Sequence, residues 1–247
     1  MTLLGDFLKA RRGRVQPPDA GSRGRRRVTG LRRDELAGLA GLSEPYLTRL
    51  EQGVDRNPSA QVLAALARAL HLDPDETAHL FRLAEPPSAP AGVAPVDLQQ
   101  LLDSWPASAA YVRNRRFDVV AANKVAMALA PIYGPGRNLV RDMFLDPAVR
   151  TLFPDWPTVA AQTAAALRAE ADLRDPRVVA LVDELSPNDD FRHLWERHDV
   201  RPTRDERKEF DHPVIGRLSL RRQSLTAAGA EDQVIIVYQG DDLARLA

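Results

Sequence analysis

The sequence predicts a multidomain protein in which an all-α domain of five helices is followed by an α+β domain with a small antiparallel sheet. Three observations predict this division. Apolar residues before residue 85 recur at helical spacing, the stretch "EPPSAPAGVAP" at residues 85–95 holds four prolines, and β-prone runs follow it. We therefore expect a first domain at residues 1–84, a linker at 85–95 and a second domain at 96–247.

The composition is that of an ordinary soluble protein, and it excludes several kinds of site. Of the 247 residues, 44% are apolar and 28% are charged. The chain has no cysteine, which excludes disulfides, thiolate catalysis and cysteine-based metal centres. Because no apolar run has the length of a signal peptide or a membrane span, we expect a cytoplasmic protein with no membrane partner.

The charge is balanced over the whole chain but not along it. Residues 1–56 carry 12 Lys/Arg and 7 Asp/Glu, a net charge of +5, which leaves 22 basic and 27 acidic residues for the rest. This asymmetry indicates a basic, nucleic-acid-reading domain joined to a mildly acidic one.

The first domain is predicted as helices throughout. A first helix runs from about Leu3 to Arg12, and an irregular stretch rich in Gly, Pro and Arg follows it. Two short helices come next, and Ser59 and Asp73 are good N-caps for a fourth and a fifth helix.

The second domain is predicted as two strands, a helical middle and about three further strands. Residues 96–104 form a helix, and "AYVRN" and "FDVVAAN" form a hairpin. Residues 139–200 are mainly helical, and the C-terminal strands are "KEFDHP", "GRLSLRRQSLTA" and "QVIIVYQ".

The stretch "LAGLAGLSEPYLTRLEQG", residues 36–53, joins the two short helices very tightly. Gly41 stands where the first of them ends, and glycine adopts the left-handed conformation of that position at least cost. Ser43 can cap the second helix, and Pro45 falls in its first turn, where a missing N–H does no harm. Apolar residues at fixed offsets complete the pattern: Leu36, Ala37, Ala40, Leu47 and Leu50. This pattern predicts a helix-turn-helix unit.

Burial of Leu47 and Leu50 leaves the opposite face of the second helix for a partner. In a helix-turn-helix unit that face enters the major groove of double-stranded DNA. The competing interpretation is a hairpin with a solvated face, but the basic domain favours DNA. We interpret "GSRGRRR", residues 21–27, as an arm that contacts phosphates or the minor groove, rather than as a solvated loop. The predicted DNA-binding residues are Arg25, Arg26, Arg27, Arg32, Arg33, Ser43, Glu44, Tyr46, Thr48, Arg49 and Gln52.

Nearly the whole chain resembles one family of bacterial regulators. The run from "GLRRDELAGLAGLSEPYLTRLEQG" through "PSAQVLAALARALHLD" resembles the helix-turn-helix domain of the MmyB-like branch of the xenobiotic-response-element regulators. "AYVRNRRFDVVAAN", "NLVRDMFLDPAVRTLFPDW", "FRHLWERHDVR" and "FDHPVIGRLSLRRQSL" resemble the family's ligand-binding domain. The turn "EQGVDRNPS" departs from the family by being longer. The resemblance implies a PAS-like second domain that binds a small, apolar, fatty-acid-like ligand.

A pocket for such a ligand is expected to be apolar with a few polar anchors. The candidate anchors are Arg113, Asn123 and His198. For any single aromatic residue, a place in the ordinary core is the competing interpretation. The predicted ligand-binding residues are Tyr111, Arg113, Phe117, Asn123, Met127, Met143, Phe144, Trp195, His198 and Tyr238.

No catalytic or metal site is predicted. His198 precedes Asp199, but neighbouring residues on a helix face apart, and His193 and His198 do not have the four-residue ligand spacing. We therefore expect no enzyme activity and no cofactor. The sequence predicts a DNA-binding transcription regulator, acting as a homodimer, whose second domain senses the ligand. The alternative is that this domain is a ligand-free module for dimerisation or partner docking.

Overall fold

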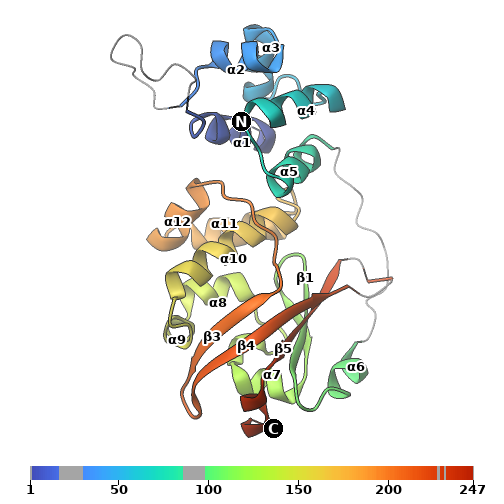
Figure 1. Ribbon diagram of the computed structural model, residues 1–247, viewed down its shortest axis with the longest axis vertical. Helices are drawn as coiled ribbons and strands as arrows, with labels where there is room; N and C mark the ends of the chain where they lie inside the picture. Colours follow the sequence, from blue (N-terminus) through green and yellow to red (C-terminus); the bar gives the residue numbers. More distant parts are fainter. Residues whose placement is uncertain (1, 17–29, 86–97, 227–228, 231, 247) are drawn as a thin grey trace. The chain divides into compact units, whose positions relative to one another are not determined.

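Figure 1 shows the computed structural model of the protein, which describes residues 2–16, 30–85, 98–226, 229–230 and 232–246. The chain divides into two compact units, residues 1–89 and 90–247. The predicted linker lies outside the described residues except for Glu85, and so do the arm at residues 21–27 and its Arg25, Arg26 and Arg27.

The described part of the first unit is a bundle of five helices, which confirms the predicted all-α domain. Side chains of Thr2, Ser43, Ser59 and Asp73 cap the N-termini of four of them. Each accepts a hydrogen bond from a backbone N–H that a helix start leaves without an internal partner. The helices are α1 (Leu3–Arg12), α2 (Arg33–Ala40), α3 (Glu44–Gln52), α4 (Ala60–Ala69) and α5 (Pro74–Ala84).

The core of this unit is built on leucines at helical spacing. α1 packs against α3 and α5, and α2 packs against α3 and α4. Helix α1 approaches α3 very closely at Gly5, where a Cβ atom would lie 2.2 Å from the carbonyl oxygen of Glu51. The leucines with no exposed surface are Leu8, Leu31, Leu36, Leu47, Leu50, Leu66 and Leu80.

In the described part of the second unit, five strands form one antiparallel sheet in the order β2-β1-β5-β4-β3. The last strand in the sequence therefore lies in the middle of the sheet, between β1 and β4. The strands are β1 (Ala109–Asn114), β2 (Val119–Ala122), β3 (Glu206–His212), β4 (Gly216–Leu225) and β5 (Gln233–Gln239).

Helices fill the sequence between β2 and β3, as expected from the helical middle. One helix, α7, was not predicted, because its six residues directly follow the apolar run of β2. Within the described residues, no helix is long and apolar enough to cross a membrane. The helices of the whole second unit, of which α6 precedes β1, are α6 (Gln99–Asp103), α7 (Lys124–Leu129), α8 (Leu139–Leu145), α9 (Pro147–Leu152), α10 (Trp156–Glu170), α11 (Pro176–Leu185) and α12 (Asp189–Glu196). The unit also has two 3₁₀ turns, η1 (Pro131–Tyr133) and, after β5, η2 (Asp241–Arg245).

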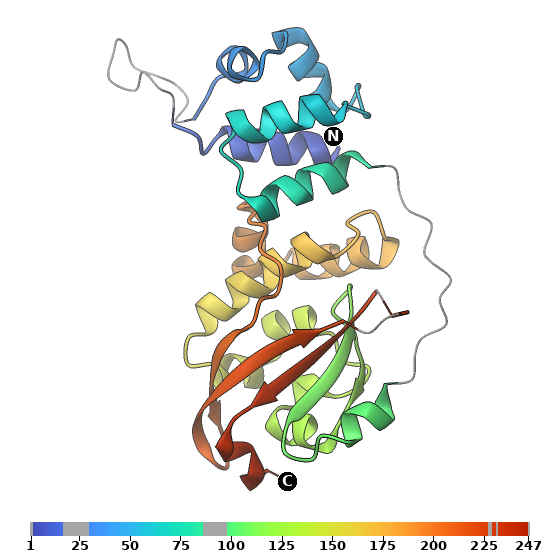
Figure 2. The same cartoon turned by 45° about the vertical axis from the view of Figure 1, so that its right-hand side comes forward.

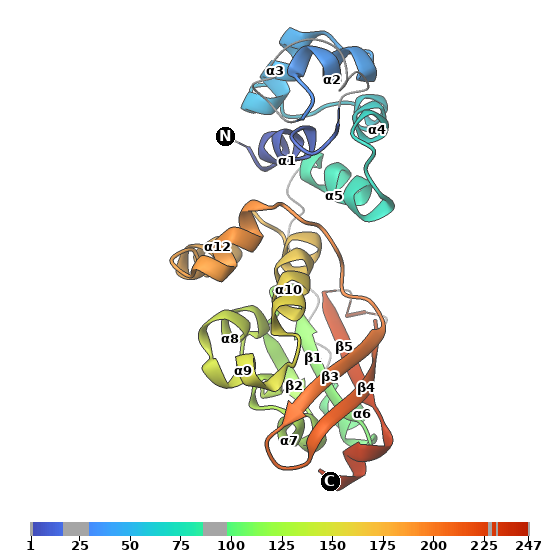
Figure 3. The same ribbon diagram turned by 60° about the vertical axis from the view of Figure 1, so that its left-hand side comes forward.

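The two faces of the sheet are covered differently (Figure 3). Side chains of β1 and β5 alternate between the faces, as strand geometry requires. Ile236 and Tyr238 point into the large core under α7 to α10, whereas Ile235 and Val237 belong to a smaller cluster with α6. This arrangement confirms the predicted α+β unit with a small antiparallel sheet.

Candidate DNA interface and ligand cavity

The turn between α2 and α3 has the geometry that the sequence predicts. Gly41 adopts a left-handed conformation with φ of 66°, and the N–H of Leu42 donates to the carbonyl of Ala37 at 2.8 Å. Ser43 Oγ then accepts a 3.3 Å hydrogen bond from the N–H of Tyr46 and starts α3. These contacts close α2 and open α3 within three residues, which defines the angle between the two helices.

The outward face of α3 carries the predicted reading residues. Leu47 and Leu50 are fully buried, and their positions therefore determine which face of α3 points outward. Glu44, Arg49 and Gln52 are exposed, and Tyr46 and Thr48 are half-buried beside them.

Arg49 is held in place by a residue of the longer turn after α3. Its Nε donates to Asp55 Oδ2 at 2.9 Å, and its guanidinium carbon lies 5.8 Å from the centre of the Tyr46 ring. The sequence pattern does not predict Asp55 as a partner of Arg49. Asp55 stands six residues after Arg49, beyond the helical spacings that predict side-chain pairs.

Arg33 has a structural partner in addition to any contact with DNA. Its Nε donates to Glu51 Oε2 at 2.6 Å, and Glu51 Oε1 accepts from Arg12 Nε at 2.8 Å. Glu51 is fully buried, so one carboxylate ties α1, α2 and α3 together. Arg32 is exposed, and its backbone N–H donates to Glu35. Both arginines remain predicted phosphate contacts.

A cavity of about 70 Å³ lies in the second unit, between the helix-covered face of the sheet and α10. Residues 201–204 line one side of it. They belong to the segment that passes α10 on the way from α12 to β3 (Figure 2). Aromatic and aliphatic side chains line it together with charged side chains. The lining residues are Tyr111, Arg113, Phe117, Ile132, Tyr133, Leu139, Met143, Phe153, Val159, Gln162, Thr163, Ala166, Arg201, Pro202, Thr203, Arg204, Glu206, Lys208, Arg222, Ile236 and Tyr238.

The cavity brings together five of the ten predicted ligand residues: Tyr111, Arg113, Phe117, Met143 and Tyr238. Among them, Arg113 is already neutralised. Its Nη2 donates to Glu170 Oε2 at 2.6 Å and to Thr203 Oγ1 at 3.0 Å. Burial by itself raises the pKa of Glu170, but Arg113 and Thr203 outweigh it and lower that pKa below its ordinary value.

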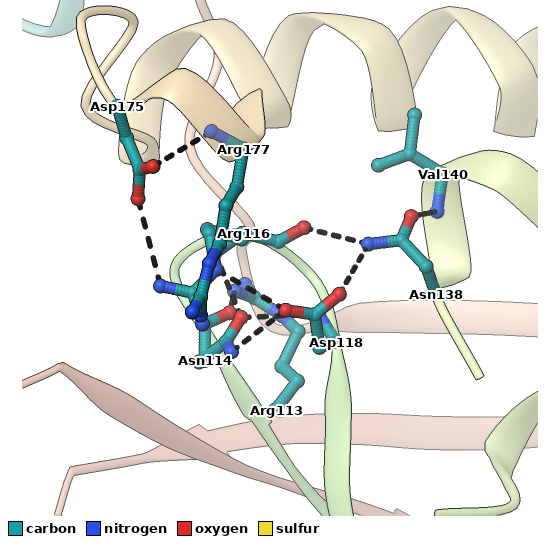
Figure 4. Close-up of polar contacts among 8 residues, drawn as sticks. All are labelled: Arg113, Asn114, Arg116, Asp118, Asn138, Val140, Asp175 and Arg177. Carbon is teal, nitrogen blue, oxygen red and sulfur yellow. Dashed lines mark hydrogen bonds and ion pairs between the residues drawn. The ribbon is translucent and has the colours of Figure 1, made fainter. Parts of the chain in front are cut away.

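Phe117 is held at the cavity by the turn between β1 and β2. It adopts a left-handed conformation with φ of 68°, which is uncommon outside glycine, and Arg113 lies 4.0 Å from the centre of its ring. Asn114 Oδ1 accepts from the N–H groups of Arg116 and Asp118, and so shapes the turn (Figure 4).

Asp118 and Asn138 join this turn to the start of α8 (Figure 4). Asn138 Nδ2 donates to Asp118 Oδ1 at 2.8 Å and to the carbonyl of Arg116 at 2.9 Å, while Asn138 Oδ1 caps α8. Burial alone raises the pKa of Asp118, but hydrogen bonds from Asn114, Asn138 and Arg116 lower it. A carboxylate thus fastens the wall of the cavity.

The other five predicted ligand residues lie outside the lining of the cavity. Asn123 Oδ1 caps α7 and accepts from Ala126 N–H at 2.9 Å, while its Nδ2 donates to backbone carbonyls of the segment before β1. Met127 is exposed on α7. For both residues, the position on the short helix α7, which the sequence analysis missed, determines the role.

The remaining three predicted residues also contact other parts of the second unit and do not line the cavity. They are Phe144, Trp195 and His198. Phe144 packs edge to face on Phe191 at 5.1 Å between ring centres, and Trp195 stacks on the same ring at 5.5 Å. His198 has φ of 51° just after α12, where its N–H donates to the Trp195 carbonyl. Phe144 thus belongs to the core and Trp195 packs against it, while His198 lies half-buried after the end of α12.

Charged cavity residues on β3 and β4 were not predicted, namely Glu206, Lys208 and Arg222, and neither were Arg201 and Arg204 before β3. Strand alternation was the signal, because Lys208 shares its face of β3 with buried Phe210, and Arg222 shares its face of β4 with buried Leu220. Tyr133 was missed as well. Burial raises the pKa of Tyr111 and of Tyr133 well above 10, so both phenols keep their protons.

Two family models match the chain. Residues 93–245 match the MmyB-like transcription regulator ligand binding domain, a match that spans more than half of the 247 residues. Residues 3–80 match a helix-turn-helix domain. No curated protein matches the chain.

Proposed function

This chain belongs to the MmyB-like transcription regulators, and from that membership we propose how it works: α3 reads DNA, and the cavity of the second unit senses a small molecule. A DNA-binding transcription regulator follows from the two matched domains. The reading residues, the ligand and the coupling between the units are the proposal.

The observation that carries the DNA-reading proposal is the face of α3. Arg49 and Gln52 are exposed, and Thr48 is half-buried. The Ser43 cap and the buried side chains of Leu47 and Leu50 hold α3 in position. Rigid presentation matters because a side chain that is already oriented loses less conformational entropy when it contacts a base. The ion pair with Asp55 orients the guanidinium of Arg49 in this way.

The experiment begins by selecting DNA sites for the full chain from a random library, since the operator is unidentified. The double variant Thr48→Ala, Arg49→Ala is expected to lose discrimination between selected and scrambled sites in a gel shift, by roughly 1–3 kcal/mol for each good base contact. Arg68→Ala removes one exposed cation from α4 and is the matched control. Unchanged discrimination in the double variant overturns the role of α3.

We propose further that the protein binds DNA as a homodimer. One short helix reads few bases, and two copies on half-sites about 34 Å apart add their contacts. The selected sites are then expected to be two-fold symmetric, and sedimentation of the complex is expected to give two chains per site. Asymmetric sites bound by one chain contradict this.

The cavity supports the sensing proposal, and a cavity between a sheet and helices supports the PAS-like assignment. The fatty-acid-like ligand remains a prediction from the family, and about 70 Å³ suits its short members better than its long ones. Native mass spectrometry of the purified full chain tests the sensor against the ligand-free dimerisation module. A bound small molecule supports the first, and a dimer that carries none supports the second.

A further inference from the structure

The charged side chains that line the cavity carry an excess of positive charge. Arg113 and Glu170 neutralise each other, so they add no net charge to the cavity. Among the described lining residues, Glu206 supplies the single carboxylate, and both Lys208 Nζ and Arg222 Nη2 contact its Oε1, at 3.0 and 3.3 Å. Arg201 and Arg204 also line the cavity, and both side chains are exposed to solvent.

Arg222 also has a donor that is not used. Its Nη2 donates to the Arg204 carbonyl at 2.5 Å, but its Nε is buried and has no hydrogen-bond partner in the described part of the chain. A buried donor without an acceptor is unfavourable, and native proteins rarely keep one without a role. Burial lowers the pKa of Arg222, but the interactions with Tyr238 and Glu206 outweigh burial and raise this pKa above its ordinary value.

Phenol groups stand beside this donor. Arg222 faces Tyr238 across the β4–β5 ladder, and Tyr133 Oη lies 3.3 Å from Tyr238 Oη. Tyr111 stacks on Tyr133 with 4.6 Å between ring centres. The Tyr133 hydroxyl donates to Tyr238 Oη, and the Tyr238 hydroxyl can in turn donate to an acceptor that carries negative charge.

The volume of the cavity limits the size of the molecule that carries this acceptor. One water molecule needs about 10–15 Å³ on this measure of cavity volume, so the cavity has room for on the order of five water molecules. That is the size of a short chain or a single ring. The apolar walls around it are Phe117, Ile132, Met143 and Phe153.

We propose that the cavity binds a compact organic acid, a short-chain or single-ring monoanion whose charged group meets Arg222 and whose apolar body lies against the phenylalanines. The proposal rests on the sensing function above and names the chemistry of its ligand. It assigns Arg222, which the sequence analysis did not single out, as the residue that recognises the acid.

Arg222 also connects this ligand to the segment of residues 201–205. Contacts that hold the segment include Thr203 with Glu170, the Arg204 carbonyl with Arg222, and Asp205 with the N–H of Ser224 at 2.8 Å. An acid that engages the guanidinium competes with the contact to Arg204. Ligand binding is therefore expected to change the contacts of the segment between α12 and β3.

The test compares an acid with its neutral analogue of the same shape, on the full chain. Benzoate is expected to bind in calorimetry and to raise the unfolding temperature, and benzamide is expected to bind at least roughly tenfold more weakly, because it lacks the charge-assisted hydrogen bond. Arg222→Gln is expected to remove this difference. Arg221→Gln is the matched control, since Arg221 is the adjacent residue and is exposed.

Three outcomes overturn the proposal: no binding of benzoate, acetate or octanoate; equal binding of benzoate and benzamide; or tight binding of myristate that Arg222→Gln leaves unchanged. If Arg222→Gln does not fold, the comparison of benzoate with benzamide on the unaltered chain still decides. The result is separate from the proposed function. A neutral ligand that binds in the cavity refutes the acid and leaves the sensor intact, whereas loss of the DNA-reading role of α3 appears only in the gel shift.

Discussion

The ion pair of Arg113 and Glu170 is the contact at residue scale that most constrains the cavity. Their side chains are 2% and 16% exposed, and the charged atoms are 2.6 Å apart. Glu170 Oε1 also accepts from the N–H of Thr203 at 2.6 Å, so this carboxylate holds the segment of residues 201–205 as well. Removal of one partner from a buried pair costs much more than the pair contributes, because the remaining charge loses its compensation.

Glu170→Gln is therefore expected to destabilise the second unit by about 3 kcal/mol at pH 7. The folded-state pKa of Glu170 is lowered, so its contribution is fully present above the unfolded value of about 4.3 and is lost as the pH falls through the folded value. Urea unfolding between pH 3 and 7 checks this, and the variant is expected to lose part of the acid dependence.

The control for this variant is Glu184→Gln, which breaks an exposed ion pair with Arg141. Solvent screens that pair, so a change of less than about 1 kcal/mol is expected. Parallel pH profiles for the unaltered chain and Glu170→Gln would contradict the account of the buried pair.

At the scale of elements, the position of α3 depends on two glycines for different reasons. Gly41 has φ of 66° but open space around its missing Cβ, so an alanine meets backbone strain alone. Gly5 has no such strain, but a Cβ there would lie 2.2 Å from the carbonyl oxygen of Glu51 at the end of α3. An alanine at Gly5 must push α1 away from α3.

Gly41→Ala is expected to cost about 1 kcal/mol, the price of a left-handed conformation for an L-residue, and to keep DNA binding. Gly5→Ala is expected to cost clearly more and to weaken DNA binding, because overpacking shifts the backbone. Amide hydrogen exchange in α1 and α3, together with the gel shift, measures both effects. Equal losses in the two variants would contradict the distinction between strain and close approach.

At the scale of the whole molecule, sensing requires that the ligand distinguish two states of the protein. An acid that changes the affinity for DNA by a given factor must have its own affinity changed by DNA by the same factor. A ligand that binds both states equally shifts nothing, however tightly it binds.

We expect benzoate at saturation to change the dissociation constant for a selected DNA site by roughly 5–150-fold, the usual range of such coupling. The same factor is expected when benzoate is titrated into the protein–DNA complex. Arg221→Gln is expected to keep the coupling and Arg222→Gln to lose it. A factor of one with bound acid would point to a second unit that does not regulate DNA binding.

The sequence by itself determined the local features of this protein. Apolar spacing, Gly41 and Ser43 predict the five helices and the tight turn, because capping and periodicity act over a few neighbouring residues. Alternation predicts the hairpin and three C-terminal strands for the same reason. α7 was not predicted, because its residues directly follow the apolar run of β2, and the capping role of Asn123 was therefore not predicted either.

Tertiary structure alone decided the order of the strands and the contents of the cavity. Nothing local places β5 beside β1, since that pairing joins residues more than a hundred positions apart. The same holds for Arg222 and Tyr133, which meet through Tyr238. Long-range contacts select one arrangement among many compatible with the same periodicities, and only the folded chain shows which charged side chains face inward.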